Sequence, residues 1–161
     1  MQLEPATDIP VRLSVNGEKR ELTVEARRSL ADVLRRELGL TGTRVGCETG
    51  VCGTCTVLAD GDPIRSCLTL AASADGTSVE TVESLAAGGR LSALQKALAD
   101  HFGLQCGFCT PGFLMLATAL VRAGGPPDRE RIREHLAANL CRCTGYTPIV
   151  DAVESVLRDA A

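Results

Sequence analysis

Hydrophobic and polar residues alternate near the start of the chain, which is typical of a β-strand with one buried face. The alternation runs through residues 11–15, and Asn16-Gly17 follows it directly. Asn-Gly is a preferred pair for a two-residue hairpin turn. The alternation resumes through residues 22–24. The pattern therefore predicts a β-hairpin in the first part of the fold.

A helical period replaces the alternation after residue 29. The apolar residues that share one helix face are Leu30, Val33, Leu34 and Leu38. Ser29 has the side chain of an N-cap, with Asp32 three residues further on, and Gly39 suits the end of a helix. We therefore expect a helix over residues 30–38.

A second hairpin is predicted within residues 56–70, "TVLADGDPIRSCLTL", with its turn at Asp60-Gly61. A short strand is expected near residues 79–82. The returning strand of the hairpin should place Cys67 opposite residues 54–56. This first half of the chain is thus expected to form a small mixed sheet with one helix.

The second half has a helical pattern throughout. The sequence "AAGG" at residues 86–89 suggests a linker. Four helices should follow it, one with Leu91, Leu94 and Leu98 on one face and then residues 111–123, 128–138 and 148–160. The residues expected to face inward in the last two are Ile132, Leu136 and Leu140, then Ile149, Val153, Val156 and Leu157. Four short helices of this kind suggest a compact bundle.

Composition limits the classes of function that remain. The chain has 161 residues, 2% aromatic residues and no Trp, and small domains with so few large apolar side chains often rely on a metal site. A net charge of -3 argues against a nucleic-acid or anionic-membrane partner. The first residues do not resemble a signal peptide, and the longest apolar run, 113–121, is too short for a membrane span. We therefore expect a soluble, cytoplasmic protein.

Eight cysteines carry the chemistry of this sequence. They form two quartets, Cys47, Cys52, Cys55 and Cys67, then Cys106, Cys109, Cys141 and Cys143. Eight cysteines in a cytoplasmic chain indicate metal binding rather than four disulfides.

The first quartet has the spacing C-x4-C-x2-C-x11-C. Its first three cysteines match the plant-type ferredoxin pattern, in which a short loop holds a [2Fe–2S] cluster. Zinc would favour two close cysteine pairs, which this spacing fits poorly. Gly46, Gly50 and Gly53 are expected to let backbone N–H groups approach the sulfurs.

The second quartet, C-x2-C-x31-C-x-C, is ambiguous on spacing alone, and zinc could accept it. All the aromatic residues lie in the same segments, either as ordinary core or as a dry shell around a buried cluster; they are Phe102, Phe108, Phe113 and Tyr146. Thr110-Pro111 and Thr147-Pro148 each follow a cysteine pair, so each pair should precede a helix that Thr caps. The positive end of each helix would then face an anionic centre.

Four segments together resemble the iron–sulfur subunit of the xanthine dehydrogenase family of molybdenum hydroxylases, a family that includes the small subunit of aerobic carbon monoxide dehydrogenase. These segments are "GCETGVCGTCTV", "SC" at residues 66–67, "LQCGFCTPG" and "NLCRCTGY". The resemblance covers about residues 11–156. It implies an α+β fold, with a ferredoxin-like β-grasp domain over residues 1–85 and a four-helix bundle over residues 86–161, each holding one [2Fe–2S] cluster.

The resemblance also implies a function. The chain would relay electrons from the molybdopterin centre of a large partner subunit to FAD in a medium partner subunit, in a heterotrimer that can itself dimerise. The first cluster would lie on the flavin side, and Gln105 and Cys143 would lie against the pterin. No residue of this chain would be catalytic. The alternatives are a free-standing carrier with two clusters and a zinc-stabilised interaction module.

Overall fold

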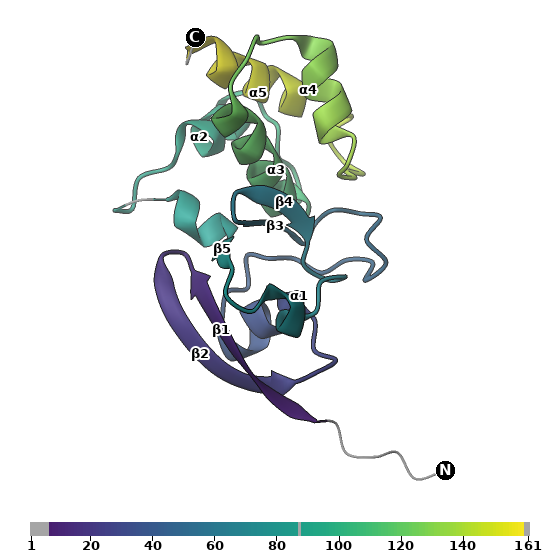
Figure 1. Cartoon of the computed structure of the whole chain (residues 1–161). Helices are drawn as coiled ribbons and strands as arrows, with labels where there is room; N and C mark the ends of the chain where they lie inside the picture. Colours follow the sequence, from purple (N-terminus) through teal and green to yellow (C-terminus); the bar gives the residue numbers. More distant parts are fainter. Residues whose placement is uncertain (1–6, 87, 160–161) are drawn as a thin grey trace.

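The computed structural model describes residues 7–86 and 88–159. Within them the chain has an α+β fold with a mixed, five-stranded sheet (Figure 1). The strands are β1 (Asp8–Val15), β2 (Glu18–Glu25), β3 (Thr56–Ala59), β4 (Asp62–Arg65) and β5 (Ser78–Glu80). Their order in the sheet is β2-β1-β5-β3-β4, and only the β1–β5 pair is parallel. This is consistent with a ferredoxin-like domain.

Both predicted hairpins are confirmed. β1 and β2 pair up to Val15 and Glu18, with Asn16 and Gly17 at φ values of 51° and 84°. Positive φ at both turn positions matches the twist of the strands that the turn joins. The β3–β4 hairpin repeats this geometry, with Asp60 and Gly61 at 50° and 94°.

The predicted helix over residues 30–38 has the expected buried face but not the expected form. It begins as α1 (Leu30–Asp32) and continues as a π-helical turn, η1 (Val33–Glu37). Ser29 caps it as predicted, because its hydroxyl accepts the N–H of Asp32 at 3.1 Å. The wide turn arises where the N–H of Leu38 reaches back to the Val33 carbonyl.

The other helical segments are η2 (Ala71–Ala74), η3 (Val82–Leu85), α2 (Ala93–Asp100), α3 (Thr110–Ala123), α4 (Arg129–Leu136) and α5 (Thr147–Asp159). Two expected core residues are exposed. Leu91 is 63% exposed because it precedes Ser92, the cap of α2, and Leu140 is 49% exposed because α4 has already ended. The predicted strand near residues 79–82 is β5 followed by η3. Ala87 of the expected linker and Ala160 lie outside the described residues.

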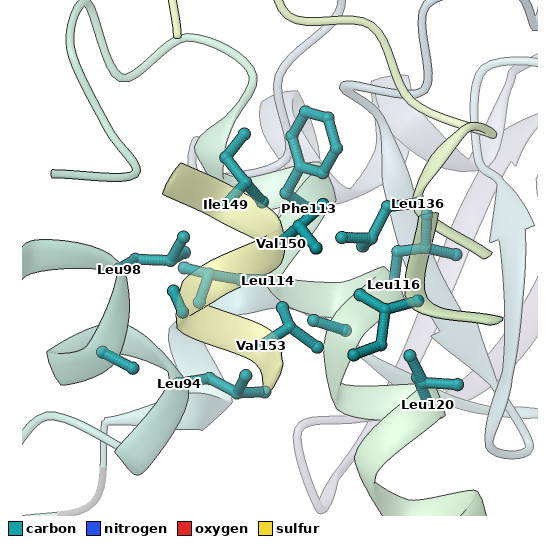
Figure 2. Packing of buried hydrophobic residues seen from close by; sticks show 14 of the residues in the cluster. Leu94, Leu98, Phe113, Leu114, Leu116, Leu120, Leu136, Ile149, Val150 and Val153 are labelled. Carbon is teal, nitrogen blue, oxygen red and sulfur yellow. The ribbon is translucent and has the colours of Figure 1, made fainter. Parts of the chain in front are cut away.

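Each half of the chain has its own hydrophobic core. In the first half, α1 and η1 contribute Leu30, Val33 and Leu34 to the core of the sheet. In the second half, α5 packs against α2 and α4, and α3 packs against α4. Figure 2 shows this helical core around Phe113, Ile149 and Val153. Among the helices of the described residues, none has the length and apolar character needed to cross a bilayer.

α3 connects the two halves. It packs against β3 and β4 as well as against α4, and Figure 1 shows it between the sheet and the other helices. Val82 and Leu85 of η3 also pack against the helical core. One cysteine of each quartet adjoins this contact, because Cys55 directly precedes β3 and Cys109 directly precedes α3.

Candidate metal centres

The first quartet begins in an irregular loop, residues 46–55, that has no strand or helix. Left-handed backbone at Glu48, Gly50 and Gly53, with φ values of 56°, 78° and 73°, makes the loop turn repeatedly. The sulfur of Cys47 accepts N–H groups from Thr49 and Cys52, each at 3.4 Å. A loop that directs amides at sulfur suits an anionic iron–sulfur centre.

The β3–β4 hairpin brings Cys67 to this loop, as the sequence predicts. The N–H of Ser66 donates to the Cys55 carbonyl at 3.4 Å, and its hydroxyl donates to the same oxygen at 2.7 Å. Burial, followed by a hydrogen bond with Cys55, raises the pKa of the Cys67 thiol to about 11. By contrast, a side-chain hydrogen bond with Thr49 and the amides of Cys52 and Thr49 lower the pKa of Cys47 to about 6.

The predicted approach of the glycine backbone to the sulfurs is supported at Gly50, whose backbone hydrogen bond acts to lower the pKa of Cys67, and stays a prediction at Gly46 and Gly53. A Cβ at Gly50 would overlap the side chain of Leu68, and one at Gly53 would overlap the Asn139 amide. These two glycines leave room for neighbouring side chains and adopt positive φ. At Gly46 a Cβ would lie 3.4 Å from the sulfur of Cys52.

The second quartet joins two loops. Cys106 and Cys109 precede α3, while Cys141 and Cys143 lie between α4 and α5. The sulfurs of Cys106 and Cys143 are 3.6 Å apart. Burial, followed by a hydrogen bond with Cys141, raises the pKa of Cys109 to about 12. Packing of α3 against α4 thus brings together cysteines that are far apart in the sequence.

Thr144 donates two hydrogen bonds to the sulfur of Cys141. Its hydroxyl lies 3.1 Å from that sulfur and its N–H lies 3.4 Å away. Burial alone would raise the pKa of Cys141, but the hydrogen bonds from Thr144 are among the contacts that lower it overall.

The predicted helix caps are not formed as expected. Thr110 lies inside α3, whose N-cap is Cys109 without a side-chain hydrogen bond, although Pro111 does occupy the first turn.

The thiols approach one another two by two. The pairs are Cys47 with Cys52, Cys55 with Cys67, Cys106 with Cys143, and Cys109 with Cys141. All eight cysteines are free thiols. Among the described residues, no group of three or more His, Cys, Asp or Glu side chains surrounds a single metal-ion position. Two thiolates on each of two irons is the ligand arrangement of a [2Fe–2S] cluster, so these donors and their pairing fit that group.

A polar contact holds the two cysteine loops together. The N–H of Leu140 donates to the carbonyl of Cys52 at 2.9 Å. Arg65 donates to Gly50 O at 3.2 Å and also to Ala138 O, so one guanidinium binds both loops. Asn139 is buried beside them. Sequence analysis missed Arg65 and Asn139, although both adjoin cysteine motifs, in "RSC" and "NLC".

The aromatic residues near the second quartet do not form a closed shell in this chain. Phe113 is 1% exposed and belongs to the helical core, which confirms ordinary core packing for that ring. Phe102 and Phe108 are 80% and 45% exposed. Three polar residues at the second quartet are exposed as well: Gln105, Cys106 and Cys143. The second quartet therefore opens to the surface at Cys106 and Cys143, while Cys141 is buried.

Two family models match the chain. A 2Fe-2S iron-sulfur cluster binding domain matches residues 13–92, and a [2Fe-2S] binding domain matches residues 81–154. The first model spans the first cysteine quartet and the second model spans the other. These matches support the fit of the two quartets to iron–sulfur clusters.

Curated relatives and solved structures also match most of this chain. The small subunit of nicotine 6-hydroxylase from Paenarthrobacter nicotinovorans is 54% identical, over 92% of this chain and 90% of its own length. A chain of quinoline 2-oxidoreductase from Pseudomonas putida 86 superimposes with a TM-score of 0.92 at 49% identity, covering 95% of each chain. Aldehyde oxidoreductase from Desulfovibrio gigas gives 0.89 at 44% identity, over 94% of this chain but 17% of the larger one.

Proposed function

The chain belongs to the family of small iron–sulfur subunits of xanthine dehydrogenase and aldehyde oxidoreductase enzymes, and we propose that it relays electrons within such a complex through two [2Fe–2S] clusters. It is the iron–sulfur subunit of an oxidoreductase. When bound, a [2Fe–2S] cluster accepts and returns one electron at a potential set by its surroundings. The work of this chain is to hold the clusters and set those surroundings.

Each quartet is proposed to hold one cluster. Cys47, Cys52, Cys55 and Cys67 would hold the first, and Cys106, Cys109, Cys141 and Cys143 the second. The pairwise approach of the thiols supports this assignment, as do the N–H donors to Cys47 and Cys141. Domains at residues 1–85 and 86–161 follow from the assignment, the first a β-grasp and the second a four-helix bundle. The separate cores of the two halves support them.

The observation that carries the relay is the hydrogen bond from Leu140 to Cys52. Cys52 belongs to the first quartet, and Leu140 precedes Cys141 of the second. One hydrogen bond of 2.9 Å therefore joins the backbone of one proposed cluster ligand to the residue next to another. Arg65 fixes the same two loops against each other. The fold thus gives the two sites a short and fixed connection.

Exposed side chains around the two quartets support two partner contacts. Gln105 and Cys143 are proposed to lie against the molybdopterin of a large subunit, and Phe102 and Phe108 offer apolar surface beside them. The first quartet is proposed to face the FAD of a medium subunit. Leu68, which is 60% exposed, gives that side an apolar contact of its own. The three subunits would form a heterotrimer.

We place the chain in the cytoplasm, where eight thiols stay reduced until the clusters assemble. Two relatives are named for nicotine and quinoline, which are nitrogen heterocycles. Nitrogen heterocycles are therefore the substrates to test first on the assembled complex.

Anaerobic purification tests the function. We expect two irons and two acid-labile sulfides for each cysteine quartet, a visible spectrum that substrate bleaches, and co-purification with molybdenum and flavin subunits. Zinc without labile sulfide would overturn the proposal in favour of a zinc-stabilised interaction module. A chain that carries both clusters but always emerges alone would instead be a free-standing carrier.

A further inference from the structure

Tyr146 has a backbone conformation that its side chain disfavours. Its φ is 68°, in the left-handed region, directly after Gly145 at 69°. Glycine adopts such angles freely, whereas a bulky residue is an outlier there. A tyrosine retained at this position needs a compensating contact.

The phenolic oxygen of Tyr146 makes that contact. It accepts the N–H of Cys141 at 3.1 Å. Tyr146 N–H donates to the hydroxyl of Thr144 at 3.2 Å, and that hydroxyl lies 3.1 Å from the Cys141 sulfur. Three hydrogen bonds therefore close a ring through Cys141, Tyr146 and Thr144. We call this the Cys141 ring.

The ring of Tyr146, which is 38% exposed, packs against the helical core at its edge. It lies edge-on to Phe113, with 6.4 Å between centroids and 70° between planes. Phe113 packs near Ile149 and Val150 in Figure 2. Tyr146 and these three residues also line one apolar cavity of about 420 Å³. The phenol thus connects the loop of Cys141 to Phe113 of the helical core.

We propose that Tyr146 is the positioning residue that sets the reduction potential of the second cluster, through the Cys141 ring. This inference rests on the proposed function, since it requires a cluster on Cys141. Donors to a ligand sulfur stabilise the more negative, reduced cluster. Tyr146 bonds both the Cys141 N–H and the Thr144 hydroxyl, and it thereby holds that hydroxyl within hydrogen-bond distance of the Cys141 sulfur.

The decisive variant is Tyr146→Phe in the full chain, loaded with iron and sulfide and isolated with its partners. It keeps the aromatic ring and removes the acceptor of the Cys141 N–H. We expect a more negative potential and an altered EPR signal for the second cluster only. Thr144→Val, which removes the donor and keeps Tyr146, should shift the same cluster in the same direction.

Phe113→Leu is the matched control. It changes the packing against Tyr146 and removes none of the three hydrogen bonds, so it should lower the melting temperature and move the potential much less than Tyr146→Phe does. If the Tyr146→Phe protein binds only the first cluster, the Thr144→Val protein tests the same expected shift in potential.

Two outcomes overturn the proposal. The first is a fully loaded Tyr146→Phe protein with unchanged potential and EPR signal, and the second is an equal shift of both clusters. A wild-type chain that takes up no iron would overturn the proposed function as well, so the two failures are distinguishable.

Discussion

The two cysteine quartets reach the same kind of arrangement by different routes. The first is local, because one loop supplies three cysteines and an adjoining hairpin supplies Cys67. The second joins loops separated by α3 and α4, so its geometry depends on how those helices pack. A local site can be predicted from spacing and turn residues, whereas a site made by packing needs the tertiary structure.

The largest expected effect tests whether the two sites are independent. Cys52→Ser should lose the first cluster, which is half of the bound iron, and keep the second, because the second half has its own core. Cys109→Ser should show the reverse pattern and also disturb the start of α3. Iron analysis and EPR of both variants measure this. Loss of both clusters from either variant would contradict the two-site comparison.

The contact between the halves is tightly packed at Gly112. A Cβ there would overlap the backbone oxygen of Gly53 and lie 3.0 Å from the Thr54 Cα. Helix propensity alone predicts that Gly112→Ala stabilises the chain by up to about 1 kcal/mol. Overpacking costs about 1–3 kcal/mol, and backbone atoms cannot move aside easily. We therefore expect net destabilisation in chemical unfolding, and an increase in stability would show that the two halves are loosely joined.

Arg65 tests the polar part of the same contact. Arg65→Met keeps the aliphatic stem and removes the hydrogen bonds to Gly50, Thr56 and Ala138. We expect a loss of about 2 kcal/mol in the free energy of unfolding, since hydrogen bonds from a charged group contribute about 1.5–3 kcal/mol. Arg36→Met is the control, because Arg36 makes an exposed pair with Asp32 and should cost under about 0.5 kcal/mol. Equal losses of stability in the two variants would show that Arg65 does not connect the two loops.

The smallest effect concerns the ion pair between β5 and α3. Arg122 donates two hydrogen bonds to Glu80, at 2.7 and 2.8 Å, and these lower the pKa of Glu80 below its ordinary value of 4.5. Because the pKa is lowered, the ion pair stabilises the folded state above pH 4.5, and this stabilisation is lost as the pH falls through the pKa of Glu80 in the folded state. Partial exposure limits it to roughly 0.5 kcal/mol.

The test is a comparison of Glu80→Gln with the wild type in chemical unfolding at pH 7 and at pH 3. The variant should be slightly less stable at pH 7, and the difference should shrink at pH 3. A difference that stays constant with pH would assign the effect to packing rather than to charge.

Sequence analysis succeeded where the signals are local and failed where they depend on packing. Asn16-Gly17 and Asp60-Gly61 specify their hairpins through backbone preference alone. Leu140 has a helix-like period, but α4 ends before it, and its N–H turns to Cys52 instead. Nothing in the spacing of Gly53 indicates that a buried Asn139 occupies the space of its missing side chain.

The site residues follow the same division. Cys67 could be placed beside Cys55 because strand pairing has a fixed register. The hydroxyls of Thr144 and Tyr146 could not be assigned, because their contacts with Cys141 depend on one left-handed residue after a glycine. The ligand assignment itself stays a prediction until iron is measured.

The double contact of Arg65 has a consequence for maturation. Its side chain bonds one loop of the first half and one of the second, and it is the last residue of β4. During synthesis β4 is complete long before Ala138 emerges from the ribosome. We therefore expect the N-terminal half to serve as a template on which the later loop settles.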